Sequence, residues 1–545
     1  METAPGSCDD RPVDVDDFVT AVGTTPASLE ETAPRPDADT VVDRAVVRAA
    51  RWLSEAEQLR THREKANRRR LTRLLHDPAG LPVTMALTDE VMRISDPARA
   101  GATLRRAAAA SNPRALGVRD HVGLTALRGI SPVVPAASMK LVHWQVRAAS
   151  EGIILPADQR ALRKHLAKRA AQGARLNINV LGEAVLGEEE AAHRLDRVVE
   201  MLERPEVGYV SVKISSIAAQ LSTYDHAGSV ARVAERLRRL FRAAHGKEPR
   251  AFVNLDMEEY RDLDLTIDAF TQVLDEEPFH GLEAGIVLQA YLPECHARFE
   301  RLLAWAKARR ATGGARIKVR LVKGANLAME SCEAQVHGWP AGPYATKADV
   351  DASYKRVVDV ALRPENADAV RIGIASHNLF DLAWALEVAE LRGVREQIDI
   401  EMLEGMANAE AMAIVGDVGS VLLYAPVTRA DDFASAVAYL VRRLDENTAP
   451  ENFLRASFSL TVGSDTFAEQ EARFRAAVAA RSTVSTESHR HEPIEPIEPE
   501  PVTEGLFGNE TETDVTRPEE RTEIAAALYR NAAGWDRPIP LAEPR

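Results

Sequence analysis

The sequence has few cysteines, no long apolar run and no excess of basic residues. Only Cys8, Cys295 and Cys332 occur among its 545 residues, and they form neither a C-x-x-C pair nor a disulfide framework. This usage favours a reducing compartment. The acidic N-terminus METAPGSCDD lacks the apolar core of a signal peptide. No apolar run approaches the ~20 residues that a membrane helix needs. We therefore expect a cytoplasmic protein and leave open a peripheral association with the inner membrane face.

The charge balance excludes a further class of protein. The formal net charge is -14, which argues against a general nucleic-acid binder because such proteins usually present a basic face. Hydrophobic residues make up 45% and charged residues 28%, as in an ordinary globular protein. No nucleic-acid partner is expected.

Composition divides the chain into four parts. Residues 1–40 are rich in Pro, Asp and Thr and predict a mobile arm, whereas residues 41–170 show helical periodicity. Residues 171–465 alternate between short apolar runs and helical patterns, and residues 481–545 form a Pro- and Glu-rich, linker-like tail with a short helix near 518–530.

Short β-branched or apolar runs predict eight strands in the central part. They lie at 174–181, 208–215, 251–256, 284–292, 316–322, 370–376, 397–403 and 419–425. Helical stripes lie between them, for example Val233, Leu237 and Phe241 on one face. Eight strand–helix units predict an α/β fold, a (β/α)8 barrel preceded by an all-helical region. A doubly wound open sheet is the alternative, and the lack of a G-x-G-x-x-G turn after any strand disfavours it.

Polar residues gather where the predicted strands end, which is where barrels of this type carry their sites. Any single polar residue in a strand is commonly an outward-facing side chain, but this set recurs on consecutive strands. Its members are Lys213, Asp256, Gln289, Tyr291, Arg320, Lys323, Ser376, His377, Asn378, Glu401, Glu404 and Tyr424.

A final helix is predicted over 431–447 and adds a cluster of charged residues. Arg442 and Glu446 are four residues apart, a spacing common in surface ion pairs. Arg442 and Arg443 together would also suit a carboxylate, because guanidinium forks match carboxylate oxygens two at a time. Spacing alone favours the surface pair.

Several of these segments together resemble the proline dehydrogenase family, above all the dehydrogenase half of bifunctional proline-utilisation flavoenzymes. The resemblance spans about residues 70–465. The segments that carry it are VSVKIS, VNLDMEEY, LQAYL, RLVKGA, ASHN, LEGM, LLYAPV and YLVRRLDEN. It implies a distorted barrel that binds FAD and oxidises L-proline to Δ1-pyrroline-5-carboxylate, with hydride transfer to flavin N5 and a membrane quinone as electron acceptor. No metal is implied.

The resemblance also implies roles for individual residues. Lys213, Arg442 and Arg443 would bind the substrate carboxylate, with Asp256 and Glu446 ordering that polar network. Leu403, Tyr424 and Tyr439 would pack against the pyrrolidine ring, and Arg320 would lie near flavin N5. The flavin-contacting positions would be Asp256, Gln289, Arg320, Val322, Gly324, Ser376, His377 and Asn378, with Lys347 near the cofactor phosphates.

The sequence departs from the family pattern in three places. Asn326 stands where the family usually has Tyr after RLVKGA, and Ser376 replaces Thr in the T-H-N strand end. The aldehyde dehydrogenase domain that follows in bifunctional relatives does not fit in what remains after residue 465. We expect either a monofunctional enzyme or a fragment, with the pyrroline-5-carboxylate dehydrogenase separate or missing.

Two other functions compete with this interpretation. A Schiff-base aldolase on the same fold would use Lys213 as its nucleophile. It would not account for Arg442 and Arg443, or for Gln289, Arg320 and His377. A binding or regulatory protein without catalysis is the second, for which Asn326 is the only indication.

Overall fold

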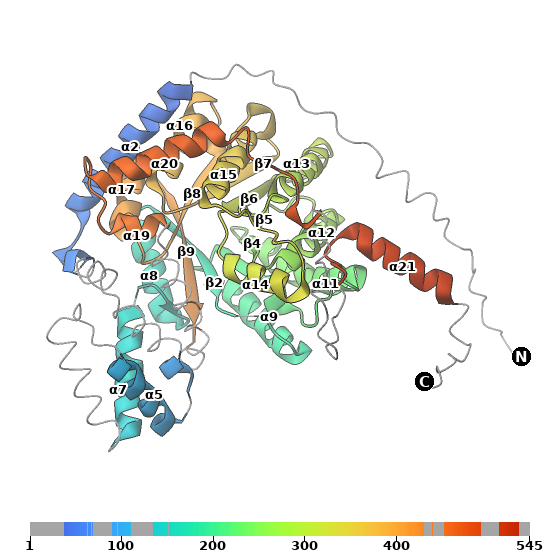
Figure 1. Cartoon of the computed structure of the whole chain (residues 1–545), viewed down its shortest axis with the longest axis horizontal. Helices are drawn as coiled ribbons and strands as arrows, with labels where there is room; N and C mark the ends of the chain where they lie inside the picture. Colours follow the sequence, from blue (N-terminus) through green and yellow to red (C-terminus); the bar gives the residue numbers. More distant parts are fainter. Residues whose placement is uncertain are drawn as a thin grey trace, which may run out of the picture.

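The computed structural model describes residues 38–62, 64–66, 68, 90–94, 96–110, 134–150, 152–182, 184–429, 436, 439, 452–491 and 512–532. Figure 1 shows a central set of strands surrounded by helices, with the helices α5 and α7 set apart from that body. The predicted arm lies outside the described residues up to residue 37. The predicted helix over 431–447 also lies outside them, apart from Ala436 and Tyr439.

Eight parallel strands form a closed barrel. They are β2 (Ala174–Val180), β3 (Tyr209–Lys213), β4 (Phe252–Asp256), β5 (Gly285–Gln289), β6 (Ile317–Val322), β7 (Val370–Ala375), β8 (Ile398–Leu403) and β9 (Val421–Thr428). Each strand pairs with the next, and β9 pairs back with β2, which closes the sheet. The predicted barrel is confirmed and the open sheet is excluded. One two-residue strand, β1 (Leu155–Pro156), was not predicted and pairs with the end of β9.

Helices cover the barrel. They are α9 (Glu188–Glu203), α11 (His226–His245), α12 (Leu263–Leu274), α13 (Cys295–Ala311), α15 (Lys347–Ala361), α16 (Leu379–Leu391) and α17 (Asn408–Val418). The predicted stripe of Val233, Leu237 and Phe241 is fully buried. Asp225 caps α11 by accepting a hydrogen bond from the Gly228 N–H at 3.1 Å, and Thr346 caps α15. Burial of these stripes is the main stabilising term for such helices.

Shorter elements fill the connections. The loops after β3 and β6 carry α10 (Ile214–Ile217) and α14 (Leu327–His337). Single 3-10 turns are η2 (Val91–Arg93), η3 (Tyr260–Asp262), η4 (Glu277–Phe279), η5 (Pro364–Asn366), η6 (Arg395–Gln397) and η7 (His489–His491).

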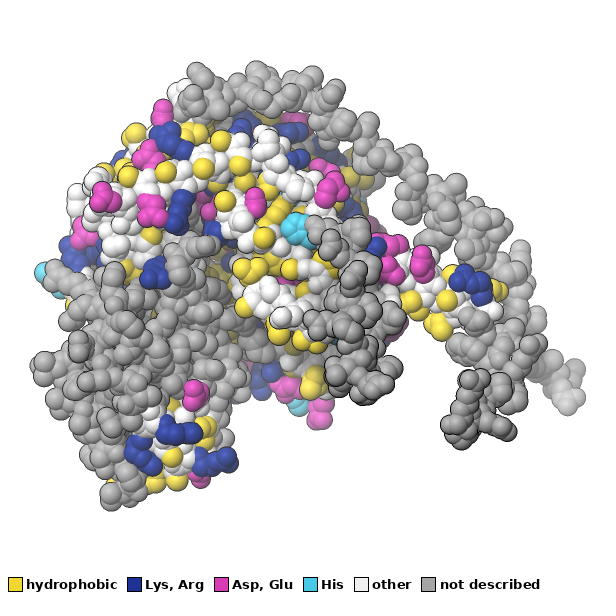
Figure 2. Space-filling view, viewed as in Figure 1, with side chains coloured by type: hydrophobic (Ala, Val, Ile, Leu, Met, Phe, Trp, Pro, Cys, Tyr) yellow, Lys and Arg dark blue, Asp and Glu magenta, His cyan; other side chains and the backbone are white. Residues whose placement is uncertain are grey.

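Helices form the described N-terminal part, and the first and the last of them pack on the barrel body. They are α2 (Ala38–Leu59), α5 (Pro97–Ala110), α7 (Pro135–Ser150) and α8 (Gln159–Ala171). Helix α2 packs across α16 and α17 (Figure 1), with Trp52 fully buried and its indole N–H donating to Asp417 at 3.0 Å. No helix of the described part is long and apolar enough to cross a membrane. On the face in Figure 2, described side chains of both charges are interspersed with apolar ones.

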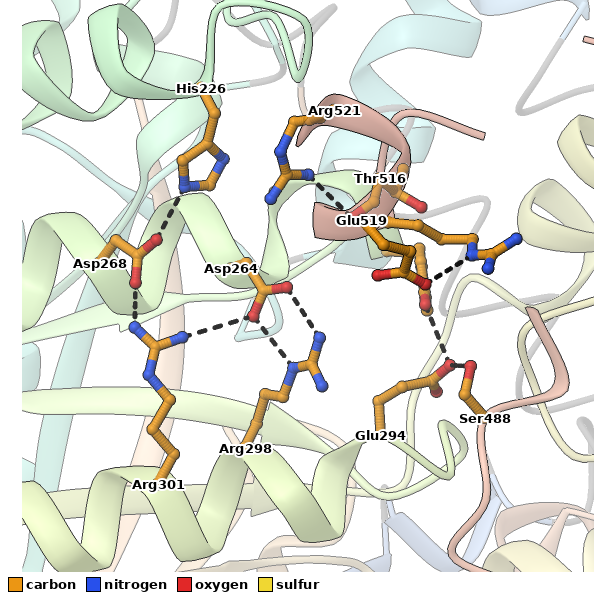
Figure 3. A network of polar contacts seen from close by, with 12 residues as sticks. His226, Asp264, Asp268, Glu294, Arg298, Arg301, Ser488, Thr516, Glu519 and Arg521 are labelled. Carbon is orange, nitrogen blue, oxygen red and sulfur yellow. Dashed lines mark hydrogen bonds and ion pairs between the residues drawn. The ribbon is translucent and has the colours of Figure 1, made fainter. Parts of the chain in front are cut away.

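Part of the C-terminal region packs on the barrel body more closely than its composition suggests, whereas its last helix has no buried residue among those described and projects away from that body (Figure 1). Its helices are α19 (Phe453–Ser457), α20 (Asp465–Ala480) and α21 (Pro518–Ala532). Arg490 is buried between the rings of Tyr260 and Trp339 and pairs with Asp514 at 3.0 Å. Figure 3 shows Ser488 beside Glu294 in the same region. Linker-like composition did not predict these contacts, because they depend on single side chains rather than on periodicity.

Figure 3 also shows a row of ion pairs that joins three barrel helices. His226 of α11 contacts Asp268 of α12 at 2.7 Å, and Arg298 of α13 contacts Asp264 at 2.8 Å. Arg301 bridges the two aspartates. These groups are partly exposed, so each pair contributes modestly to stability.

Candidate active site at the carboxyl ends of the strands

The barrel closes with the polar strand ends at one mouth. Across the sheet, Lys213 of β3 lies opposite Asp256 of β4, and Leu403 of β8 lies opposite Tyr424 of β9. Parallel strands end at the same edge, so residues far apart in the sequence meet there. The structure therefore brings together most of the predicted site residues that it describes.

Asp256 is the centre of the buried polar network at this mouth. Its carboxylate accepts a hydrogen bond from the Tyr424 hydroxyl at 2.8 Å and from Asn254 at 3.2 Å, and it lies 3.4 Å from the Arg320 guanidinium. Burial raises the pKa of Asp256, although Arg320 and the Tyr424 hydroxyl act in the opposite direction. The network holds Asp256, Arg320 and Tyr424 in fixed relative positions.

Arg320 lies in the barrel interior and presents its charge towards the mouth. Its guanidinium stands 4.6 Å from the centre of the Tyr424 ring, a cation–π distance, and its Nε is 2.9 Å from Glu401. Burial acts to lower the pKa of Arg320, but Glu401 and Asp256 outweigh it and raise that pKa. Arg320 is therefore a fixed positive charge.

Lys213 is paired with a residue that the sequence pattern did not single out. Its Nζ lies 2.5 Å from a carboxylate oxygen of Glu258, in the loop after β4. The backbone carbonyl of Glu258 accepts hydrogen bonds from Asn326 at 2.8 Å and from Gln289 at 3.1 Å. The only sequence signal for Glu258 is its place inside the VNLDMEEY segment.

The turn after β6 brings the backbone at Gly324 close to the Tyr291 ring. Gly324 has φ of +120°, a conformation that favours glycine, and a Cβ there would overlap the Tyr291 ring. Val322 is the last residue of β6 and is half-buried. The close approach of backbone to aromatic ring at this point therefore requires glycine.

Lys347 lies in a cluster of lysines and aspartates beside the end of β6. Lys323 bridges Asp351 and Asp381, each at 2.6 Å, and Lys347 also contacts Asp351. Lys355 pairs with Asp381 at 2.7 Å. Burial and the neighbouring Lys323 lower the pKa of Lys347 to about 8, even though a third of its side chain is exposed. The three lysines exceed the two aspartates by one positive charge, which suits an anionic ligand.

The Ser376-His377-Asn378 turn joins β7 to α16. Ser376 Oγ accepts from the Asn378 N–H at 3.0 Å, and Asn378 caps α16 by accepting from the Phe380 N–H at 3.0 Å. The Nε2 atom of His377 accepts from the Leu403 N–H at 3.1 Å, which ties this turn to β8. In the free protein, Ser376 and Asn378 thus order the turn itself.

Tyr439 is buried in a small apolar cluster with residues of the N-terminal helices. Its neighbours there include Val91, Ala100 and Leu104. Residues of the N-terminal helices therefore pack against Ala436 and Tyr439. Arg442, Arg443 and Glu446 lie outside the described residues, so the carboxylate clamp stays a prediction.

A sequence model of the family described as proline dehydrogenase matches residues 162–456, more than half of the chain. The chain belongs to the proline dehydrogenase family. The matched range contains the whole barrel, β2 to β9, and every site residue discussed above.

Relatives extend the likeness to larger proteins. A curated bifunctional protein PutA of Klebsiella aerogenes is 28% identical over 305 residues, which are 53% of this chain and 22% of that protein. The solved structure of proline utilization A from Corynebacterium freiburgense is 46% identical with a TM-score of 0.61, over 72% of this chain and 37% of that one.

A second solved structure shares more of the fold. It is proline utilization A from Bdellovibrio bacteriovorus, inactivated by N-propargylglycine, with 26% identity and a TM-score of 0.71 over 91% of this chain and 49% of that one. The chain thus spans about a fifth of the curated relative and less than half of either solved chain.

The described residues fit a flavin dinucleotide, the cofactor that the family resemblance implies. The Oε1 atom of Gln289 is buried and accepts no hydrogen bond from any described residue, so it can accept one from a ligand. The lysine cluster around Lys347 provides the cationic side. Among the described residues, no group of His, Cys, Asp and Glu is arranged to hold a metal ion.

Proposed function

We propose that the protein oxidises L-proline to Δ1-pyrroline-5-carboxylate with FAD as its cofactor and passes the electrons to a quinone at a membrane surface. The observation that carries this proposal is the joint placement of Lys213, Asp256, Arg320 and Tyr424 at one barrel mouth. Membership in the proline dehydrogenase family supports the same reaction.

The substrate carboxylate would be bound by cationic side chains. Lys213 is held in the mouth by Glu258, and Arg442 and Arg443 would add two guanidinium forks from the last helix. Leu403, Tyr424 and Tyr439 would pack against the pyrrolidine ring and exclude water. Such binding fixes the orientation of the ring carbon that loses hydride.

FAD would supply the hydride acceptor, its N5 atom. Residues for its contacts would be Gln289, Val322, Gly324, Ser376, His377 and Asn378, with Lys347 towards the phosphates. Arg320 would stabilise the negative charge that develops on reduction, because its guanidinium is buried and remains positive. Asp256 would hold the side chains of Arg320 and Tyr424 in fixed positions relative to each other.

The aldolase alternative fits the geometry less well. A lysine that forms a Schiff base must be neutral to attack, and its site usually disfavours the ammonium form. Lys213 instead lies 2.5 Å from the Glu258 carboxylate, within ion-pair distance. This pair suits a residue that binds an anion by charge.

Anaerobic reduction of the FAD-loaded protein tests the proposal. L-Proline is expected to bleach the flavin spectrum without oxygen, and addition of a soluble quinone is expected to restore it. Titration with trans-4-hydroxy-L-proline in parallel compares the two substrates. A protein that stays colourless after saturation with FAD, or flavin that proline leaves oxidised, would contradict the proposal.

A second probe separates substrate binding from general flavin reactivity. N-Propargylglycine, the compound that inactivated the Bdellovibrio protein, is expected to abolish bleaching by proline after incubation. Trapping with borohydride in the presence of an aldehyde substrate would instead mark Lys213 if the aldolase alternative held.

A further inference from the structure

Four charged residues lie inside the barrel below the mouth. Lys318 and Arg320 come from β6, and Asp399 and Glu401 come from β8. Residues two apart on a strand point to the same side, so both pairs face the interior. Lys318 and Glu401 are each only 1% exposed. Barrel interiors of this type are usually filled by branched apolar side chains.

These side chains form a row of alternating charge that ends at the candidate site. The ammonium of Lys318 lies 2.8 Å from Asp399 and 2.6 Å from Glu401. The second oxygen of Glu401 lies 2.9 Å from Nε of Arg320. Arg320 in turn lies 3.4 Å from Asp256. Glu401 is therefore shared between a cation below it and the cation at the mouth.

The contribution of Glu401 is mainly its charge. Neither of its carboxylate oxygens receives a well-aligned hydrogen bond from a described residue, although both lie within ion-pair distance of a cation. The Arg371 and Arg175 guanidinium groups both lie 2.8 Å from Asp399, at the other end of the row. Asp399 is thus compensated by three cations, whereas Glu401 must compensate both Lys318 and Arg320.

Gly373 of β7 provides the space for this pair. It lies opposite Arg320 in the register of β6 and β7. A Cβ at Gly373 would overlap the Glu401 carboxylate and come within 2.9 Å of Cε of Lys318. The absence of a side chain on the neighbouring strand therefore accommodates the two charged groups.

We propose that Lys318 and Glu401 are positioning residues that hold the Arg320 guanidinium under the mouth and set how much of its positive charge acts there. The inference rests on the proposed flavin-dependent function. Because Glu401 also pairs with Lys318, it neutralises only part of the positive potential of Arg320. That potential favours the reduced, more negative state of a ligand above it.

Removing the charge of Glu401 and removing that of Lys318 are expected to shift the midpoint potential of bound FAD in opposite directions. Glu401→Gln takes away a negative charge beside Arg320, so the potential should rise. Lys318→Met leaves Glu401 to Arg320 alone, so the potential should fall. Each shift should be at least about tenfold in the two-electron equilibrium, about 30 mV. The double variant keeps the charge balance and should return close to the wild-type potential.

The measurement is a dye-coupled redox titration of the FAD-loaded full chain, with far-UV circular dichroism to check folding. Lys318→Arg keeps the charge, so it should shift the potential by only a small fraction of the shift that Lys318→Met causes. Arg310→Gln, which breaks a surface pair on α13, should leave the potential unchanged. General loosening of the barrel would move both single variants in the same direction, and that result would overturn the proposal.

Glu401→Asp serves if the neutral variants fail to fold. It keeps the charge but withdraws the carboxylate from Arg320, so the potential should rise, and an unchanged potential would count against the proposal. A wild-type protein that binds no FAD would overturn the proposed function as well. If proline bleaches the flavin of the wild-type protein but the variants show the wild-type midpoint potential, only this inference is overturned.

Discussion

Asn326 donates a hydrogen bond from its side-chain amide to the backbone carbonyl of Glu258 at 2.8 Å. Glu258 lies in the loop after β4 and is the ion-pair partner of Lys213. Asn326, which stands where the family usually has Tyr, is therefore linked to that loop. Asn326 is 9% exposed, so water compensates little for the loss of this bond. The residue acts on the substrate pocket through the loop.

Replacing Asn326 is expected to weaken proline binding. Asn326→Ala removes a hydrogen bond worth about 1 kcal/mol, which corresponds to about a fivefold rise in KM for proline if the loss falls on binding. Asn326→Leu is the matched variant, since it keeps about the same volume and stays neutral but cannot donate. Steady-state kinetics with an artificial acceptor measures both, and unchanged KM in the two variants would contradict this role.

The Tyr424 hydroxyl should contribute measurably to substrate oxidation. Tyr424→Phe removes the 2.8 Å hydrogen bond to buried Asp256 but keeps the ring that contacts Arg320. A hydrogen bond to a charged group contributes about 1.5–3 kcal/mol, so we expect at least a tenfold loss in kcat/KM. Tyr354→Phe is the control, because the buried Tyr354 hydroxyl has no hydrogen-bond partner in the described part of the chain.

FAD affinity is expected to fall as the pH rises through about 8. Burial and Lys323 lower the pKa of Lys347 to about 8, so its ammonium is present below that pH and lost above it. If Lys347 binds the cofactor phosphates, the apoprotein should bind FAD more tightly at pH 7 than at pH 9. Lys347→Met should weaken binding at pH 7 and flatten this dependence in a fluorescence titration. The exposed Lys307→Met should show the wild-type profile.

Glu330 should make the fold less stable as the pH rises. Burial raises the pKa of Glu330 from its ordinary value of 4.5 to about 7, against a hydrogen bond from the Tyr260 N–H that lowers it. Between these values the folded state binds more protons than the unfolded state, so the free energy of unfolding falls with rising pH.

A neutral residue at position 330 removes that pH dependence. Glu330→Gln can still accept from Tyr260 and should stabilise the protein at pH 8 by up to about 3 kcal/mol, with almost no gain at pH 4.5. Urea unfolding at both pH values measures this, beside the exposed Glu300→Gln as control. Equal effects at the two pH values would contradict the assignment.

The predicted arginine clamp is tested by Arg442→Met and Arg443→Met. Loss of one fork from a buried carboxylate site should cost about 2–5 kcal/mol of proline binding. Anaerobic flavin titration with proline gives the affinities. Unchanged affinity in both variants would leave the surface ion pair as the better interpretation of Arg442 and Glu446.

Periodicity in the sequence was enough to predict the barrel. Apolar runs separated by helical stripes such as Val233, Leu237 and Phe241 predicted all eight strands within one or two residues at most ends, because burial of apolar side chains dominates folding. The strand predicted over 284–292 extends past the end of β5, because the chain turns after Gln289. The polar strand ends could be named because every parallel strand ends at the same mouth.

The tertiary structure alone decided which partners those residues have. No spacing pattern links Lys318 to Glu401, Asn326 to Glu258, or Arg490 to Asp514, because each pair comes together only through barrel closure or chain return. Burial then gives these contacts their strength, since charges separated from water interact through a lower effective dielectric. Sequence determined the fold and the location of the site, and packing determined its electrostatics.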